Sequence, residues 1–162
     1  MVATTNTFIN SPVGAVETTL QEFQKLSTDE QLAALWFIYL ETGKSITPAA
    51  PGAARLQLAQ GLMDQVKAMS HQEQLQFMRN LVEKVNTPES RSYGVLSPNT
   101  KLAFWYRLAQ WMEEGTVVAM PSGYQLSQPG RQVIGKIQNL DFNQQITLLR
   151  RCVVDMGVDA FI

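Results

Sequence analysis

The sequence contains very few of the residues from which most catalytic and metal sites are made. One histidine, His71, and one cysteine, Cys152, stand among 162 residues, too few for a zinc ligand set or a nucleophile–histidine pair. The ten glycines are dispersed, and they form no glycine-rich phosphate loop. His71 follows Ser70 at an expected helix start, which indicates a solvated first-turn residue rather than a base. The composition therefore predicts a protein that is not an enzyme.

Long hydrophobic runs and clusters of one charge are also missing. No segment approaches the roughly 20 apolar residues needed to cross a bilayer, and the polar amino terminus does not look like a secretory signal. The 13 basic residues are scattered and the net charge is −1, so the sequence carries no nucleic-acid footprint. A single cysteine cannot form an internal disulfide, which favours a reducing compartment. We expect a cytoplasmic protein that neither spans a membrane nor binds nucleic acid.

Aromatic side chains, by contrast, are concentrated in two short windows, WFIY at 36–39 and FWY at 104–106. Leu32, Trp36 and Tyr39 fall on one helical stripe. A second stripe contains Leu102, Trp105, Ala109 and Met112. Periodicity alone favours ordinary core packing for both stripes. The alternative is a platform for a flat, elongated apolar ligand, and six internal methionines would suit such a guest.

Start and stop signals divide the chain into seven expected helices. Ser27 and Ser70 each begin a capping box, Asp141 begins a looser one, and Ser97 precedes a proline at the first helical position. Three glycines stand where helices would end: Gly43, Gly115 and Gly157. The expected helices span 15–26, 28–42, 52–68, 71–85, 98–114, 129–139 and 142–156.

These elements predict one all-α domain. The single strand-like run, at 117–120, lies between Gly115 and Pro121 and is interpreted as a connector or a helical turn. Helices joined by short loops are typical of a bundle. Residues 1–13 are expected to form a mobile amino-terminal arm. Residues 14–162 are expected to form the helical domain, with no linker and no second domain.

Five segments carry a family resemblance: QLAALWFIYLETGK at 31–44, PAAPGAA at 48–54, SPNTKLAFWYRL at 97–108, MPSGYQLS at 120–127 and QQITLLRRCVVDMG at 144–157. Together they closely resemble the N-terminal domain of the cyanobacterial orange carotenoid protein and its single-domain paralogues, the helical carotenoid proteins. The resemblance covers about residues 14 to 160. It implies two interleaved four-helix bundles with a keto-carotenoid in a tunnel between them. Canthaxanthin is the implied pigment, with echinenone or 3'-hydroxyechinenone as alternatives.

The resemblance also implies the residues that hold the pigment. Tyr39 and Trp105 match the positions that hold the carotenoid's terminal ring and the neighbouring polyene, and Trp36 and Tyr106 lie beside them. The implied tunnel wall consists of Leu32, Leu102, Met78, Met112, Met120, Ile146 and Val153.

A charged face and its partners are implied as well. Arg150 matches an arginine on the carotenoid-bearing surface, which in two-domain relatives contacts the second domain or the phycobilisome. Asn99 matches a polar residue of that same face. Arg79 and Arg151 stand where relatives have small or uncharged residues, and they change the charge of the docking surface. The implied source of the carotenoid is a free-standing homologue of the family's C-terminal domain.

Three functional hypotheses follow from these observations. The leading one is a photoprotective protein that quenches singlet oxygen without photoswitching, because no second domain is present to dissociate. The first alternative is a constitutive quencher that docks on phycobilisomes at the thylakoid surface. The second alternative is a helical adaptor whose aromatic stripes are plain core.

Overall fold

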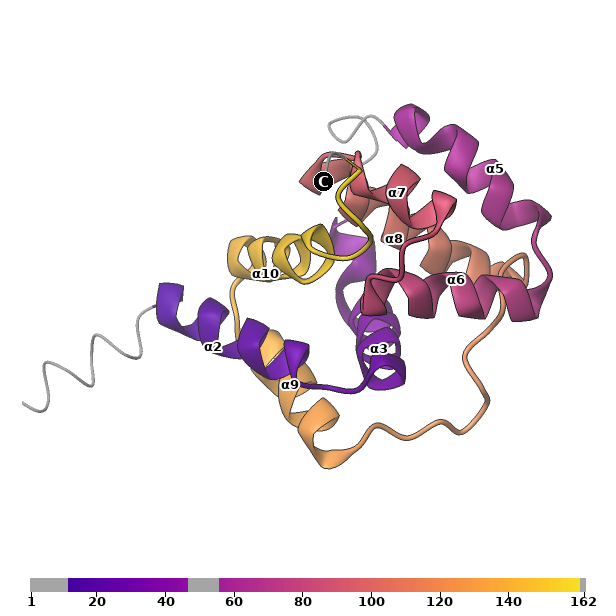
Figure 1. Cartoon of the computed structure of the whole chain (residues 1–162). Coiled ribbons are helices and arrows are strands. Elements are labelled where there is room, and N and C mark those ends of the chain that lie inside the picture. The colour runs from indigo at the N-terminus through magenta and orange to yellow at the C-terminus, as the bar shows by residue number, and fades with distance from the viewer. Residues whose placement is uncertain (1–11, 47–55, 161–162) are drawn as a thin grey trace, which may run out of the picture.

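The computed structural model describes residues 12–46 and 56–160, and every regular element in these ranges is helical (Figure 1). The elements are α2 (Pro12–Gln24), α3 (Thr28–Ile46), the 3-10 helix η1 (Leu56–Ala59), α5 (Gln60–Ala68), α6 (His71–Glu83), α7 (Pro88–Gly94), α8 (Pro98–Glu114), α9 (Gln128–Gln138) and α10 (Phe142–Val154). The predicted all-α class is confirmed. Within the described ranges, no helix is both long enough and apolar enough to cross a bilayer.

Side-chain caps fix several helices at the predicted starts. At α6, Ser70 Oγ accepts the backbone N–H of Glu73 while the Glu73 carboxylate accepts the N–H of Ser70. Asp141 and Gln144 form the same reciprocal pair at α10. Ser97 caps α8 and is followed by a proline in the first turn. Because each cap satisfies N–H groups that the helix leaves unpaired, the predicted starts at 71, 98 and 142 are confirmed.

Two of the three glycines predicted to end helices do not do so. α3 continues through Gly43 to Ile46, because glycine only weakens a helix unless its backbone adopts a positive φ. Gly115 does adopt one, at 83°, and ends α8 as predicted. Gly157 also has a positive φ, of 76°, but it lies beyond the C-cap of α10, Asp155. The run at 117–120 is a connector, which was one of its two interpretations.

Two other helix predictions need correction or fall partly outside the described residues, and one observed helix was missed. The first helix begins at Pro12 rather than 15, so its start overlaps the predicted arm, whose first eleven residues are not described. Residues 52–55 of the predicted 52–68 helix are likewise not described, and the remainder forms η1 and α5. Helix α7 was not predicted, although Thr87 and Pro88 form a capped start. Its seven residues are too few to show helical periodicity.

Helices from the two ends of the chain pack together. Helix α2 packs against α9 and α10, while α3 contacts α6, α8 and α9 and so lies between the two groups of helices (Figure 1). Two exposed ion pairs, Glu17 with Arg151 and Glu22 with Lys136, join α2 to α10 and α9. This interleaving leaves one long face of α3 directed toward α8.

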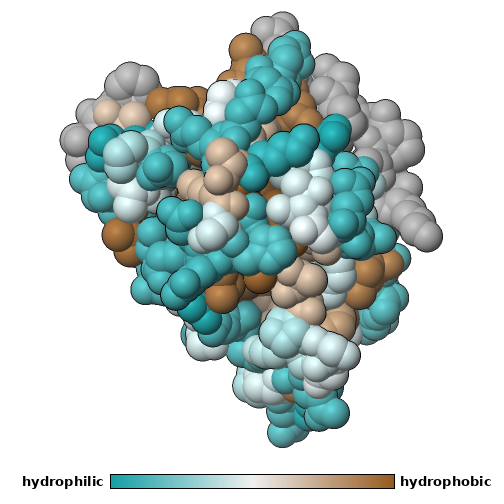
Figure 2. Space-filling view, turned by 90° about the vertical axis from the view of Figure 1, so that its right-hand side faces the viewer, coloured by the Kyte–Doolittle hydropathy of each residue, from teal (hydrophilic) through white to brown (hydrophobic). Residues whose placement is uncertain are grey.

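Large hydrophobic patches are missing from the face of the molecule in Figure 2. The face in Figure 2 is mostly hydrophilic, and its hydrophobic residues form small separate patches. The exposed large hydrophobic side chains of the described residues come from different parts of the chain: Leu40, Leu58, Val85, Val95 and Phe142. Isolated apolar residues of this kind are normal on a protein surface. The side chains of the two aromatic stripes are buried or half-buried, and none of them is fully exposed.

Candidate functional site: an elongated apolar cavity

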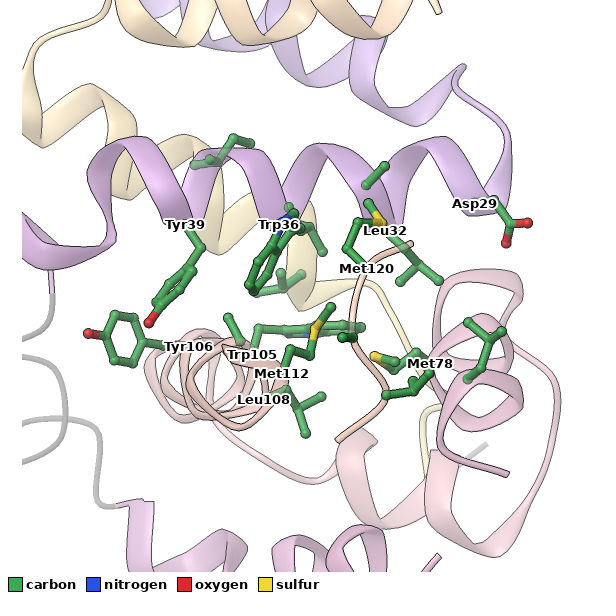
Figure 3. Close-up of a pocket in the computed structure, with 18 of the residues that line it drawn as sticks. Asp29, Leu32, Trp36, Tyr39, Met78, Trp105, Tyr106, Leu108, Met112 and Met120 are labelled. Atoms are coloured by element: carbon green, nitrogen blue, oxygen red, sulfur yellow. The ribbon is translucent and has the colours of Figure 1, made fainter. Parts of the chain in front are cut away.

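An elongated cavity of about 230 Å³ lies between α3 and α8. Its lining along α3 runs from Asp29 to Thr42, a span of about 20 Å at 1.5 Å per residue. Figure 3 shows Tyr39, Trp36 and Leu32 of α3 directed toward the side chains of α8, with Tyr39 and Tyr106 at one end and Asp29 at the other. Most of the lining side chains are aliphatic, aromatic or thioether groups. The shape and lining suit a rod-like apolar molecule.

The structure brings together ten of the twelve residues predicted for the site. These ten line the cavity: Leu32, Trp36, Tyr39, Met78, Leu102, Trp105, Tyr106, Met112, Met120 and Val153. Ile146 and Arg150 are not part of the lining. Ile146 is half-buried against the core, and Arg150 donates from its guanidinium to Asn99 Oδ1 at 3.1 Å on the exposed side of α10 and α8. That these residues contact a ligand stays a prediction.

Three aromatic rings meet at one end of the cavity. The ring centroids of Trp36 and Tyr39 are 5.7 Å apart with planes tilted by 31°, and Tyr39 meets Tyr106 edge to face at 5.2 Å. Burial and a hydrogen bond with Glu113 raise the pKa of Tyr39 well above its ordinary value. Tyr39 therefore stays neutral, and the rings present rigid apolar faces with a polar hydroxyl at their edge.

The loop from α8 to α9 closes one side of the cavity. We call residues 116–127 the strap. Val118, Ala119, Met120, Pro121 and Tyr124 of the strap line the cavity, and Figure 3 shows Met120 above Met78 and Met112. A second, more open recess lies beside the strap and shares several of these residues. The strap thus separates the cavity from an outer recess.

The first end of the strap is held by Gln74 of α6, which is 1 % exposed. Its Oε1 accepts the backbone N–H of Val118 at 2.9 Å, and its Nε2 donates to the carbonyl of Thr116 at 3.2 Å. The same Nε2 lies 3.0 Å from the Val66 carbonyl of α5. One buried amide therefore connects the strap to two helices.

The second end of the strap is held by Glu30 of α3. Its carboxylate accepts the Tyr124 hydroxyl at 2.6 Å and the Ser127 N–H and hydroxyl at 2.9 and 2.5 Å. Burial opposes the charge of Glu30, but the hydrogen bonds from Ser127 and Tyr124 outweigh it and lower the pKa of the carboxyl. In return, the hydrogen bond to Glu30 raises the pKa of Tyr124 to about 12.

This use of Glu30 corrects the predicted capping box at Ser27. Ser27 Oγ does accept the Glu30 N–H, at 3.3 Å, so half of the box is present. The Glu30 carboxylate is engaged by the strap instead of returning to the Ser27 N–H, because Tyr124 and Ser127 supply three donors. The local motif could not reveal this, since its partner lies 97 residues along the chain.

An ion pair lies at the end of the cavity opposite Tyr39. Arg79 of α6 donates to both oxygens of Asp29, from Nε at 2.8 Å and from Nη2 at 3.0 Å, and both residues belong to the lining. The hydrogen bond from Arg79 lowers the pKa of Asp29. Planar two-point pairing of this kind fixes both side chains. The positive charge of Arg79 is therefore paired with the negative charge of Asp29.

The next question is whether metal ligands, His71 or Cys152 could support catalysis. In the ranges 12–46 and 56–160, no group of three or more histidine, cysteine, aspartate or glutamate side chains is placed to hold a metal ion. His71 is exposed at the first turn of α6, as predicted. Burial raises the pKa of the Cys152 thiol, which makes it a poor nucleophile. The arrangement can bind and orient an apolar molecule.

The sequence of this chain is similar to those of known proteins. A family model described as the N-terminal domain of the orange carotenoid protein matches residues 10–159. The chain belongs to this family. The predicted resemblance is confirmed.

Individual members of the orange carotenoid protein family show how far the similarity extends. The chain is 61 % identical over 145 residues to an orange carotenoid-binding domain-containing protein of Nostoc sp. strain PCC 7120, covering 90 % of this chain and 85 % of that one. It is 48 % identical to the orange carotenoid-binding protein of Synechocystis sp. strain PCC 6803, but spans only 46 % of its length. The family therefore includes members of similar length and members about twice as long.

Solved structures of this family show the same fold. The red carotenoid protein of Anabaena (Nostoc) sp. PCC 7120, in a structure binding canthaxanthin, superposes with a TM-score of 0.78 and 43 % identity over 89 % of this chain and 99 % of its own. The orange carotenoid protein of the same organism, also binding canthaxanthin, gives a TM-score of 0.83 and 49 % identity, with 90 % of this chain and 47 % of that one covered. The fold is that of the N-terminal domain.

Proposed function

We propose that the chain holds a keto-carotenoid in the cavity between α3 and α8. The observation that carries this proposal is the apolar lining that extends about 20 Å along α3 and ends in three aromatic rings. A polyene has almost no hydrogen-bonding atoms, so its affinity comes from buried apolar area at roughly 25 cal/mol per Å². Canthaxanthin in the two Anabaena structures supports the choice of pigment.

The role that follows from such a complex is photoprotection by singlet-oxygen quenching. A bound carotenoid supplies this chemistry itself, by accepting excitation energy and releasing it as heat. The residues of the chain bind the pigment, orient it against Trp105 and Tyr39, and cover it with the strap. None of these tasks needs an acid, a base or a metal.

The proposed complex does not photoswitch. The described cavity walls belong to α3, α6, α8, α10 and the strap, which pack as one helical body. Gln74 and Glu30 hold both ends of the strap in that body. A pigment bound to these walls does not require an interface between domains to open. We therefore expect the visible spectrum to stay unchanged under strong blue-green light.

Co-expression with a canthaxanthin pathway tests the proposed function. We expect an orange-to-red protein with about one pigment per chain, measured by absorption after size-exclusion chromatography and by pigment extraction. A parallel culture that makes β-carotene but no keto-carotenoid shows whether the keto group matters. Colourless protein from the canthaxanthin host would refute carotenoid binding. A reversible red shift on illumination would refute the absence of photoswitching.

A further inference from the structure

A buried tyrosine outside the cavity lining connects two of its walls. Tyr93 of α7 has no exposed surface and is not among the residues that line the cavity. Its hydroxyl receives a hydrogen bond from Trp105 Nε1 at 2.9 Å and donates to the backbone carbonyl of Val153 at 2.6 Å. Trp105 belongs to α8 and Val153 to α10, and both line the cavity.

The direction of each hydrogen bond in this relay is fixed by chemistry. An indole N–H can only donate and a carbonyl oxygen can only accept. The Tyr93 hydroxyl must therefore give its proton to Val153 and use a lone pair to accept from Trp105. Burial raises the pKa of Tyr93 far above its ordinary value, so the proton is retained over the whole physiological range. Phenylalanine at position 93 would fill the same space but could neither donate a hydrogen bond to Val153 nor accept one from Trp105.

The position of the Tyr93 ring is itself closely defined by its neighbours. A Cβ atom on Gly157 would lie 2.6 Å from the ring, so only glycine fits there, and its φ of 76° also favours glycine. Phe104 packs edge to face on the ring with centroids 5.4 Å apart. The ammonium of Lys101 lies 5.3 Å from the ring centroid and donates to the Val154 carbonyl at 2.7 Å. The ring is enclosed from several directions.

We infer that Tyr93 is a positioning residue that holds the Trp105 ring at the angle required to bind an elongated apolar ligand. Trp105 needs such a partner because it is 8 % exposed, and its buried indole N–H would otherwise be left without an acceptor. A single hydroxyl also ties the indole to the last turn of α10, which sets the spacing between the α8 and α10 walls. This inference rests on the proposed carotenoid complex, and it adds a residue that acts on the ligand only through Trp105.

The first test uses the protein without pigment, so that it does not depend on the proposed function. The three tryptophans give three indole N–H signals in a ¹H–¹⁵N spectrum, and Trp105→Phe assigns one of them. In the wild-type chain we expect the Trp105 indole proton to exchange with solvent at least tenfold more slowly than that of half-buried Trp111. Equal exchange rates would refute the relay, and this result requires no Tyr93 variant to fold.

The second test compares Tyr93→Phe with Thr19→Val in the loaded protein. Thr19 is also buried and also donates its hydroxyl to a carbonyl, that of Ala15 at 2.7 Å, but it lies on α2 away from the cavity. We expect Tyr93→Phe to shift the Trp105 indole signal and to release carotenoid to acceptor vesicles about tenfold faster, equivalent to ~1.4 kcal/mol. Thr19→Val should change neither quantity. Equal release rates in the two variants would overturn the inference.

A double variant separates positioning from general destabilisation. If Tyr93 acts through Trp105, Tyr93→Phe should not accelerate release further once Trp105→Phe is present. An undiminished effect in that background would show that Tyr93 acts by another route and would contradict the inference. A wild-type chain that binds no carotenoid would refute the proposed function instead, while the indole exchange result would still decide the relay.

Discussion

Tyr39 and Trp105 contribute to the cavity in physically different ways. Tyr39 is half-buried, with ring contacts to Trp36 and Tyr106 and a hydrogen bond with Glu113, so we expect its loss to remove cavity-lining area with little effect on the core. Trp105 is buried and hydrogen-bonded, so its loss also leaves a void and removes the hydrogen bond that the Tyr93 hydroxyl accepts. Tyr39 is therefore the more informative position for measuring ligand contact alone.

We predict that Tyr39→Ser lowers carotenoid occupancy about tenfold or more, because removing a ring sacrifices apolar contact and ring packing together. Trp105→Ala should lower occupancy at least as much, with a reduced melting temperature. The measurement is the ratio of visible to 280 nm absorbance after co-expression. Trp111→Phe is the matched aromatic control, since Trp111 does not line the cavity. Equal occupancy in all three variants would show that the rings do not hold the pigment.

The Glu30 carboxylate gives the strap a dependence on pH. Its hydrogen bonds lower its pKa in the folded state below the ordinary value of 4.5. The resulting stabilisation is complete above pH 4.5 and is lost as the pH falls through the folded value. We predict that Glu30→Gln costs about 1 kcal/mol at pH 7.

The pH dependence of melting temperature checks this prediction. The difference between wild type and Glu30→Gln should shrink progressively below pH 4.5, because the wild-type carboxyl then becomes neutral as well. Comparing the two chains cancels the contribution of other carboxylates, including the nearby Asp29. A constant difference from pH 7 to pH 3 would mean that the charge of Glu30 does not hold the strap.

At the scale of elements, the strap depends on Gln74 more than on its own backbone pairing. We predict that Gln74→Leu destabilises the fold by ~2–4 kcal/mol, because it leaves the Val118 N–H and the Thr116 carbonyl without the amide that pairs them. Urea unfolding gives the free energy, and hydrogen exchange at the Val118 amide reports the strap directly. The same change at Gln76, an exposed residue that bonds only Asn80 on its own helix, should cost less than ~0.5 kcal/mol.

Helix starts were predictable from the sequence because their chemistry is local. Ser70 and Asp141 find their capping partners three residues away. The inward direction of the aromatic stripes also follows from helical periodicity. Gly43 misled the prediction because glycine ends a helix only when the following chain supports a positive φ. That condition depends on tertiary packing.

The candidate site was predictable through the family resemblance. Trp36, Tyr39 and Trp105 lie in its motifs and do line the cavity. The roles of Tyr93 and Glu30 could not be predicted from the sequence in this way. Tyr93 bonds Val153, which is 60 residues away in the chain, and Glu30 bonds Ser127, which is 97 residues away. A sequence pattern reports on neighbours along the chain, whereas these two residues act between helices that meet only in the folded molecule.

For the whole molecule, the two arginines that the resemblance marks as unusual are already engaged. Arg79 pairs with Asp29 at the cavity end, and Arg151 pairs with Glu17 across α2 and α10. These exposed pairs contribute little to stability, but they reduce the positive charge offered to a partner. Arg150 contacts only a neutral amide, that of Asn99, among its described hydrogen bonds. Of these three arginines, it is the one with no carboxylate partner among the described residues.

We predict strong singlet-oxygen quenching and little quenching of phycobilisome fluorescence by the loaded protein. The first needs only the enclosed pigment, whereas the second needs a positively charged face that fits the antenna. Singlet-oxygen phosphorescence and phycobilisome fluorescence measure the two activities separately. Clear loss of antenna fluorescence, removed by Arg150→Leu and weakened between 0.1 and 1 M salt as screening shortens from ~10 to ~3 Å, would favour the docking quencher.

The three thioethers in the cavity wall, those of Met78, Met112 and Met120, make the lining sensitive to oxidation. A thioether that meets an oxidant becomes a sulfoxide, which is polar and disrupts apolar packing. Oxidation of a chain without pigment would therefore make the cavity lining polar and weaken its binding of an apolar pigment. In a chain with bound pigment, the pigment would shield the sulfur atoms from the oxidant. We therefore expect an empty chain to lose its capacity for pigment under oxidising conditions, and methionine sulfoxide reductases to restore it.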